Sequence, residues 1–97
     1  MDLISLKKDT NGKNKMVAVF KNKETGRSKT THFGAVGYTD FIKSGGDEER
    51  KKKYLTRHKA RENWSDPTSA GALSKFILWN KPTLKASIDD YKKHFGF

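Results

Sequence analysis

The chain has 97 residues, of which 33% are hydrophobic and 33% are charged, and its 21 Lys and Arg outnumber its 11 Asp and Glu. This length fits one domain over residues 1–97, and the net charge of +10 predicts attraction to polyanions. The absence of cysteine excludes disulfides, thiolate nucleophiles and thiolate zinc sites. Apolar runs such as Phe76–Trp79 are far shorter than the roughly 20 residues of a membrane span, so we expect no membrane insertion. The start, MDLISLKK, lacks the pattern of a secretory signal peptide, which favours an intracellular setting.

The first third of the chain predicts a small antiparallel sheet within residues 1–34. Asn11-Gly12 and Thr25-Gly26 have the composition of turns between paired strands. The strands are expected near Leu3–Lys8, Lys15–Lys21 and Arg27–Phe33.

The middle strand indicates which face of this sheet is covered. Met16, Ala18 and Phe20 alternate with the neighbouring side chains, so one face can pack while lysines edge the other. An isolated small sheet is marginal in water, so later helices should cover the apolar face. The glycine-rich segment His32–Gly46 predicts a loop folded against the core.

The rest of the chain predicts three helices, over residues 47–64, 69–79 and 82–95. The first should start near Asp47, with Ser44 in a capping-box arrangement, and Thr68 or Ser69 should cap the second. Pro82 suits the first position of the third helix, and Gly96 should end it. The third helix carries an apolar stripe of Leu84, Ile88, Tyr91 and Phe95. The expected fold class is α+β, a three-stranded antiparallel sheet followed by three helices packed on it, in the order βββααα.

The first helix carries an unusual stripe. Arg50, Tyr54, Arg57 and Arg61 recur at i, i+4, i+7 and i+11, the spacing that apolar side chains normally occupy. Guanidinium groups beside an aromatic ring suit phosphate oxygens and stacked bases. The residues that we expect to bind nucleic acid are Arg50, Lys51, Lys52, Lys53, Tyr54, Arg57, Lys59 and Arg61, extended by Lys21, Lys23, Arg27 and Lys29 of the sheet.

Two ordinary roles compete with this interpretation. Arginine stems can cover the core while their heads pair with acids such as Asp66, Asp89 or Asp90. Lysines on strands also protect sheet edges from aggregation. Either role would leave fewer cations for a partner, although pairing cannot neutralise the whole surplus of positive charge.

Other residues could in principle act on nucleic acid or catalyse a reaction. Trp64, Trp79 and Phe33 could stack on bases, but we assign them to the core. His58 and Glu62 are spaced i, i+4, which gives too few ligands for a metal site. The G-x-x-G sequence beginning at Gly34 is not followed by the lysine and serine of a nucleotide-binding loop. We therefore expect no catalytic residue, metal or cofactor.

Three segments resemble a family of small basic proteins encoded by large double-stranded DNA viruses of protists and algae. They are KTTHFGAVGYTDF (Lys29–Phe41), RKKKYLTRHKARENWSDPTSAGALSKFILWNKPTL (Arg50–Leu84) and DYKKHF (Asp90–Phe95). The resemblance covers about two thirds of the chain and brings no activity or site residue with it. It implies a viral origin and a role in the virion, in genome packaging or in host interaction.

These observations lead to one preferred function and one rival. The preferred function is non-enzymatic, largely sequence-independent binding of nucleic acid, with DNA favoured over RNA, in a virion or genome-packaging role. The rival is a structural or protein-interaction module of a virus that binds an acidic viral or host protein. Either role belongs in the nucleus or cytoplasm of an infected host or in the virion. The sequence leaves the oligomeric state open.

Overall fold

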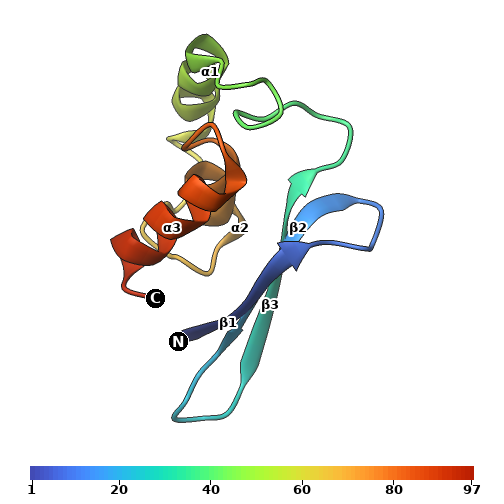
Figure 1. Ribbon diagram of the computed structural model, residues 1–97. Coiled ribbons are helices and arrows are strands. Elements are labelled where there is room, and N and C mark those ends of the chain that lie inside the picture. The colour runs from blue at the N-terminus through green and yellow to red at the C-terminus, as the bar shows by residue number, and fades with distance from the viewer.

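The elements of the protein confirm the predicted order βββααα. The computed structural model describes all 97 residues and measures 42 × 27 × 25 Å along its principal axes (Figure 1). No helix is both long enough and apolar enough to cross a membrane. The elements are β1 (Asp2–Lys8), β2 (Asn14–Lys21), β3 (Ser28–Ala35), α1 (Glu48–His58), α2 (Ala70–Leu73), the π-helical segment η1 (Ser74–Leu78) and α3 (Leu84–Phe95).

The three strands form one antiparallel sheet in the order β1-β2-β3, within two residues of the predicted bounds. Ala18 at the centre of β2 pairs with Leu6 of β1 and Thr31 of β3. The register shifts between Leu3 and Ser5, a β-bulge in the first strand. The side chain of Ile4, between them, is 58% exposed.

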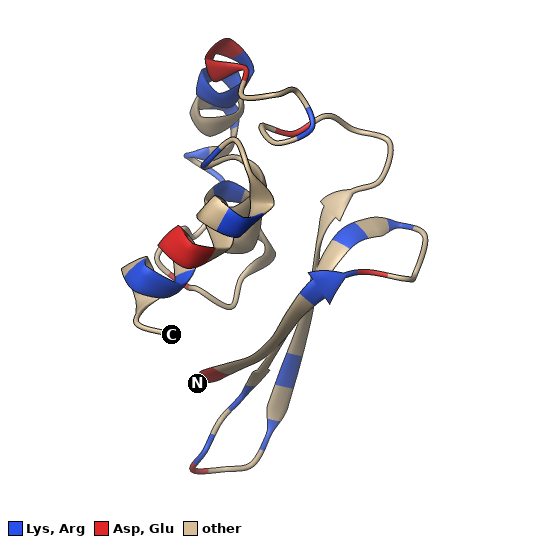
Figure 2. Ribbon diagram, in the orientation of Figure 1, with Lys and Arg blue, Asp and Glu red and all other residues tan.

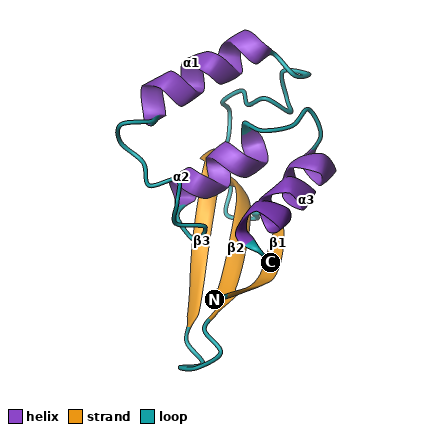
Figure 3. Cartoon of the chain, turned by 90° about the vertical axis from the view of Figure 1, so that its left-hand side faces the viewer, coloured by secondary structure: helices purple, strands orange, loops and turns teal.

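The core lies between one face of the sheet and the helical segments α2, η1 and α3 (Figure 3). Met16, Ala18 and Phe20 of β2 are all buried as predicted, but Val17, on the opposite face of the strand, is buried as well, so the alternation is incomplete. Tyr91 of α3 is also buried, and its hydroxyl donates a hydrogen bond to the Pro67 carbonyl at 2.6 Å. The core is completed by Phe33, Leu73, Ile77 and Leu78.

The prediction of a first helix over 47–64 is wrong at its C-terminus, because α1 ends at His58. Asp47 caps its start by accepting hydrogen bonds from the amides of Glu49 and Arg50, whereas Ser44 accepts from the amide of Asp47. Beyond the helix, polar side chains bond the nearby backbone in turns instead of leaving it to continue the helix, as when Asn63 accepts from the Ser65 amide.

This early end removes Arg61 from the helix. The predicted four-residue stripe is thereby reduced to Arg50, Tyr54 and Arg57.

The other two helices lie close to their predicted positions. Ser69 caps the second by accepting from the Ala72 amide at 3.1 Å, but after Leu73 the chain continues as the π-helix η1, which the sequence pattern did not indicate. The third begins at Leu84 after a Thr83 cap rather than at Pro82, because the Thr83 hydroxyl accepts from the Ala86 amide. Gly96 ends it as predicted, in the left-handed conformation with φ of 74°.

Gly34 brings the η1 segment close to the sheet. Its φ is 75°, and a Cβ at this position would lie 2.6 Å from Leu78 Cδ1. A glycine here permits both the left-handed backbone and the close approach of η1 to β3. Gly34 and Leu78 consequently meet at the inner end of the cleft described below.

Candidate nucleic-acid interface

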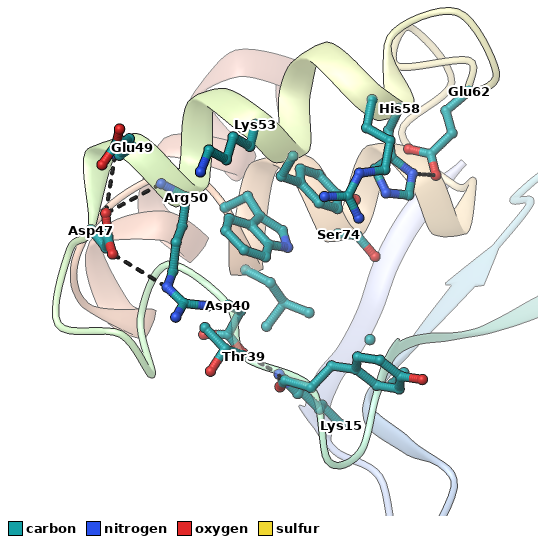
Figure 4. Close-up of a pocket in the computed structure, with 17 residues that line it drawn as sticks. Lys15, Thr39, Asp40, Asp47, Glu49, Arg50, Lys53, His58, Glu62 and Ser74 are labelled. Carbon is teal, nitrogen blue, oxygen red and sulfur yellow. Dashed lines mark hydrogen bonds and ion pairs between the residues drawn. The ribbon is translucent and has the colours of Figure 1, made fainter.

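A cleft of about 870 Å³ separates α1 from the segment that follows β3. In Figure 4, Arg50 and Lys53 extend from α1 on one side, and Lys15, Thr39 and Asp40 lie on the other. The lining residues are Lys15, Gly34, Ala35, Tyr38, Thr39, Asp40, Asp47, Glu49, Arg50, Lys53, Tyr54, Arg57, His58, Glu62, Ser74, Leu78 and Trp79.

Helix α1 has no buried residue and is held against the protein by a few contacts. The Tyr54 ring stacks on Trp79, with ring centroids 4.5 Å apart and an interplanar angle of 6°, and it also stacks on His58. The ammonium of Lys51 donates to the Asn80 carbonyl at 2.9 Å and lies 5.0 Å from the centre of the Phe41 ring. These contacts engage one side of α1 and leave the rest to solvent.

Two residues predicted to bind nucleic acid, Tyr54 and Lys51, instead contact other residues of the protein. Burial, followed by the nearby charge of Glu62, raises the pKa of Tyr54 to about 12. The prediction that Tyr54 stacks on a base is not supported, because its ring already stacks on Trp79 and His58. Lys51 positions the helix through Asn80 instead of facing solvent freely.

The arginines of the stripe are not neutralised by the acids proposed for them. Arg50 pairs with Asp47 at 3.3 Å, and both side chains are exposed, so this pair contributes little to stability. Arg57 and Arg61 are exposed and form no ion pair.

The competing role, in which Asp66, Asp89 or Asp90 pairs with these arginines, is not what the structure shows. Asp66 accepts hydrogen bonds from Thr68, and these bonds lower the pKa of its carboxyl group. Asp90 accepts from the Asn80 amide at 2.6 Å, and Asp89 is exposed without an ion pair. Asp66 and Asp90 are used within their own region of the chain, and the guanidinium groups of Arg57 and Arg61 stay unpaired.

Some of the lysines predicted to bind nucleic acid are exposed without an ion pair, whereas Lys29 contacts another residue of the protein. Lys52, Lys53 and Lys59 are exposed and form no ion pair. Lys29 lies on the helix-facing side of the sheet, where its ammonium donates to the Thr68 hydroxyl at 2.9 Å. Its contact with Thr68 takes Lys29 out of a footprint that must face solvent.

The remaining sheet cations lie far from α1. Figure 2 shows basic residues on α1 at one end of the molecule and around the β2–β3 turn at the other. Lys21 and Arg27 flank this turn without an ion pair, and Lys23 pairs weakly with Asp2 at 3.5 Å. The predicted cations therefore form two separate groups. From the α1 group, Arg50, Lys53 and Arg57 line the cleft, whereas Lys51, Lys52, Lys59 and Arg61 lie outside its lining.

Tyr38, which the sequence patterns did not single out, lines the cleft opposite α1 and is 73% exposed. Phe33 is buried in the core and Trp79 packs against it, as predicted. Trp64 does not belong to the core cluster; it is half-buried, and the ammonium of Lys75 lies 4.8 Å from the centre of its ring. The glycine before Tyr38 was a signal for a tight loop but not for the exposure of the ring.

A second ion pair and a hydrogen-bonded histidine–glutamate pair also line the cleft. Lys15 of β2 pairs with the buried Asp40 at 2.6 Å, an interaction that the sequence analysis missed. His58 and Glu62, spaced i, i+4, meet at 3.0 Å, and the second carboxylate oxygen of Glu62 accepts from the Trp64 indole. No three His, Asp or Glu side chains come together as a metal site.

The fold and the cleft define a small basic α+β protein with a peripheral cationic helix. Comparison with protein families matches residues 4–58 to a family of unknown function, DUF5754, and the chain belongs to that family. The match runs from β1 to the last residue of α1. Comparison with curated proteins and with solved structures gave no match.

The matched segment does not contain the whole core. Four core residues, Leu73, Ile77, Leu78 and Tyr91, come from the helices beyond residue 58. The sheet and α1 together carry the family match, whereas the later helices cover the apolar face of the sheet.

Proposed function

We propose that this protein binds nucleic acid without catalysis and with little sequence preference, through the exposed cations of α1. One observation carries the proposal: Arg57 and Lys53 line an open cleft without an acidic partner. Unpaired guanidinium and ammonium groups attract phosphate oxygens, which are the same at every nucleotide. Binding through such groups is strong at low salt and independent of base sequence.

The acidic residues of the cleft support a binding role. Asp40 is paired with Lys15, Asp47 caps α1 and pairs with Arg50, and Glu62 is held by His58 and Trp64. Lys15 and Arg50 thus offset the charges of Asp40 and Asp47, two of the four carboxylates in the lining that would repel a phosphate. In the same lining, Lys53 and Arg57 are unpaired cations, Glu49 forms no ion pair, and Glu62 is held by hydrogen bonds.

The resemblance to proteins of large double-stranded DNA viruses supports a biological setting for this binding. We propose a virion or genome-packaging role, in the infected cell or in the particle, with DNA favoured over RNA. The rival role, binding of an acidic protein, uses the same exposed cations and is separated by experiment.

The test is binding of a fluorescent duplex and of a fluorescent single strand, measured by anisotropy at increasing salt. The logarithm of the binding constant should fall by about 0.9 per logarithm of salt for each duplex phosphate neutralised, and by about 0.7 for a single strand. The double variant Lys53→Glu with Arg57→Glu should weaken binding at least about tenfold and make the slope shallower by about 2.

The matched control is Lys85→Glu with Lys93→Glu, which changes the net charge equally on exposed positions of α3 outside the cleft. It should lose much less affinity, and circular dichroism should show that both variants are folded. Equal losses in the two variants would contradict the assignment to the cleft. No binding of either nucleic acid at low salt would leave the acidic-protein role as the better explanation.

A further inference from the structure

Tyr38 is the one exposed aromatic side chain of the protein. Its side chain is 73% exposed, whereas every other Phe, Tyr and Trp is buried or half-buried. It has no aromatic neighbour to stack on, in contrast to Tyr54 and Tyr91. An exposed ring without an aromatic or cationic partner offers a surface on which a nucleic-acid base can stack.

The backbone around Tyr38 is held although its ring is free. The Lys15 ammonium donates to the Tyr38 carbonyl and pairs with Asp40 two residues later. On either side, the Val36 amide donates to the Lys13 carbonyl at 3.1 Å and the Phe41 amide to the Leu78 carbonyl at 3.0 Å. These anchors fix the loop on the sheet and on η1, so little ordering entropy is lost when a ligand contacts the ring.

The ring and the free cations belong to the same cleft. Tyr38 lines the cleft from the loop that follows β3, whereas Lys53 and Arg57 line it from α1. Lys53 on α1 and Thr39, the residue after Tyr38, lie on opposite sides of the cleft (Figure 4). The cleft volume of about 870 Å³ falls within the range of sites that hold small ligands. Proteins hold a strand of unpaired nucleotides by combining an exposed aromatic ring, on which bases stack, with cations that bind the phosphates, and Tyr38, Lys53 and Arg57 bring both kinds of group to one cleft.

We infer that this cleft binds single-stranded nucleic acid, with a base stacked on Tyr38 and the adjoining phosphates on Lys53 and Arg57. The inference rests on the proposed function and specifies its ligand. In a duplex the base faces are stacked on one another and are not available to Tyr38, whereas an unpaired strand offers them. The protein should therefore prefer a single strand to a duplex of the same length.

The test compares Tyr38→Ala with the wild type on a fluorescent oligothymidylate and on a duplex of the same length. Loss of the platform should weaken binding of the single strand roughly tenfold, because base stacking on an aromatic side chain contributes strongly to such binding. Binding of the duplex should change less than about twofold, because phosphate contacts remain.

Two matched variants separate stacking from other effects. Tyr38→Phe keeps the ring and should bind the single strand as the wild type does. Ile4→Ala removes an exposed apolar side chain of similar exposure on β1, outside the cleft, and should leave both affinities unchanged.

Failure of this inference can be told apart from failure of the proposed function. A Tyr38→Ala variant that binds the single strand like the wild type, or that loses equal affinity for both ligands, would overturn the stacking role while charge-dependent binding stands. A wild-type protein that binds neither ligand at low salt would overturn both.

Discussion

The body of the protein and its helix α1 are built in opposite ways. The body, formed by the sheet with α2, η1 and α3, contains the main hydrophobic core cluster, whereas α1 has no buried residue. This difference shows that the chain can carry unpaired charged side chains on α1 but not within the core of the body. Cations on the packing face of the body would bury charge at a high cost, but on a peripheral helix they remain hydrated and available to a partner.

The attachment of α1 explains how such a helix persists. Its 11 residues are fewer than the roughly 12–15 that an isolated helix needs, and cations occupy much of the stripe that would normally pack. The Asp47 cap, the stack of Tyr54 on Trp79 and the Lys51 contacts supply the missing stabilisation. The body thus holds the fold together, and α1 depends on the body.

The largest expected effect on the free energy of unfolding comes from a substitution in the hydrophobic core of the body. Phe20→Ala removes a fully buried ring and should cost about 3–5 kcal/mol, a large part of the 5–15 kcal/mol typical of a folded domain. Leu55→Ala, a half-buried position in α1, should cost about 1 kcal/mol or less. Urea unfolding followed by circular dichroism measures both. Similar losses would show that α1 contributes to global stability as much as the body does.

A smaller effect is expected from releasing α1. Tyr54→Ala removes the stack on Trp79, which is worth about 0.5–1.5 kcal/mol beyond its buried area. Hydrogen exchange should show amides of α1 losing protection while those of β2 keep theirs, because local opening leaves the body intact. Tyr54→Phe, which preserves the ring, should exchange like the wild type. A parallel loss of protection in β2 would contradict the separation of the two regions.

The smallest effect is expected from high pH. The pKa of Tyr54 is raised to about 12 from 10.0, so the folded state holds this proton more tightly than the unfolded state does. The stability that this difference contributes is present below pH 10 and is lost as the pH rises from 10 toward 12. Urea midpoints of the wild type should therefore fall more steeply over this range than those of Tyr54→Phe. Identical pH dependence would show that the Tyr54 hydroxyl is not shielded by the body.

The candidate site was only partly predictable from the sequence. The cationic face of α1 was evident from the spacing of Arg50 and Arg57, but the role of each residue depended on distant neighbours. Trp79 stacks on the Tyr54 ring, and the Asn80 carbonyl accepts a hydrogen bond from Lys51. Both neighbours lie beyond the end of α1 in the sequence. Tyr38 looked like one more loop aromatic, and only the packing of its loop left it exposed.

By itself the sequence determined the features that depend on short-range rules. The strand positions, the turns at Gly12 and Gly26, the Ser69 cap and the Gly96 stop follow from local backbone geometry and were predicted correctly. The net charge likewise needs no fold.

Only the tertiary structure decided which charges and rings are free. Asp66 and Asp90 bond within their own region, Arg57 stays unpaired, and the sheet cations near Lys21 lie at the opposite end of the molecule from α1. The physical reason is that an ion pair or a ring stack forms over a few ångströms between segments far apart in the sequence. Local patterns state which groups a chain carries, whereas the packing of its elements determines which of those groups meet.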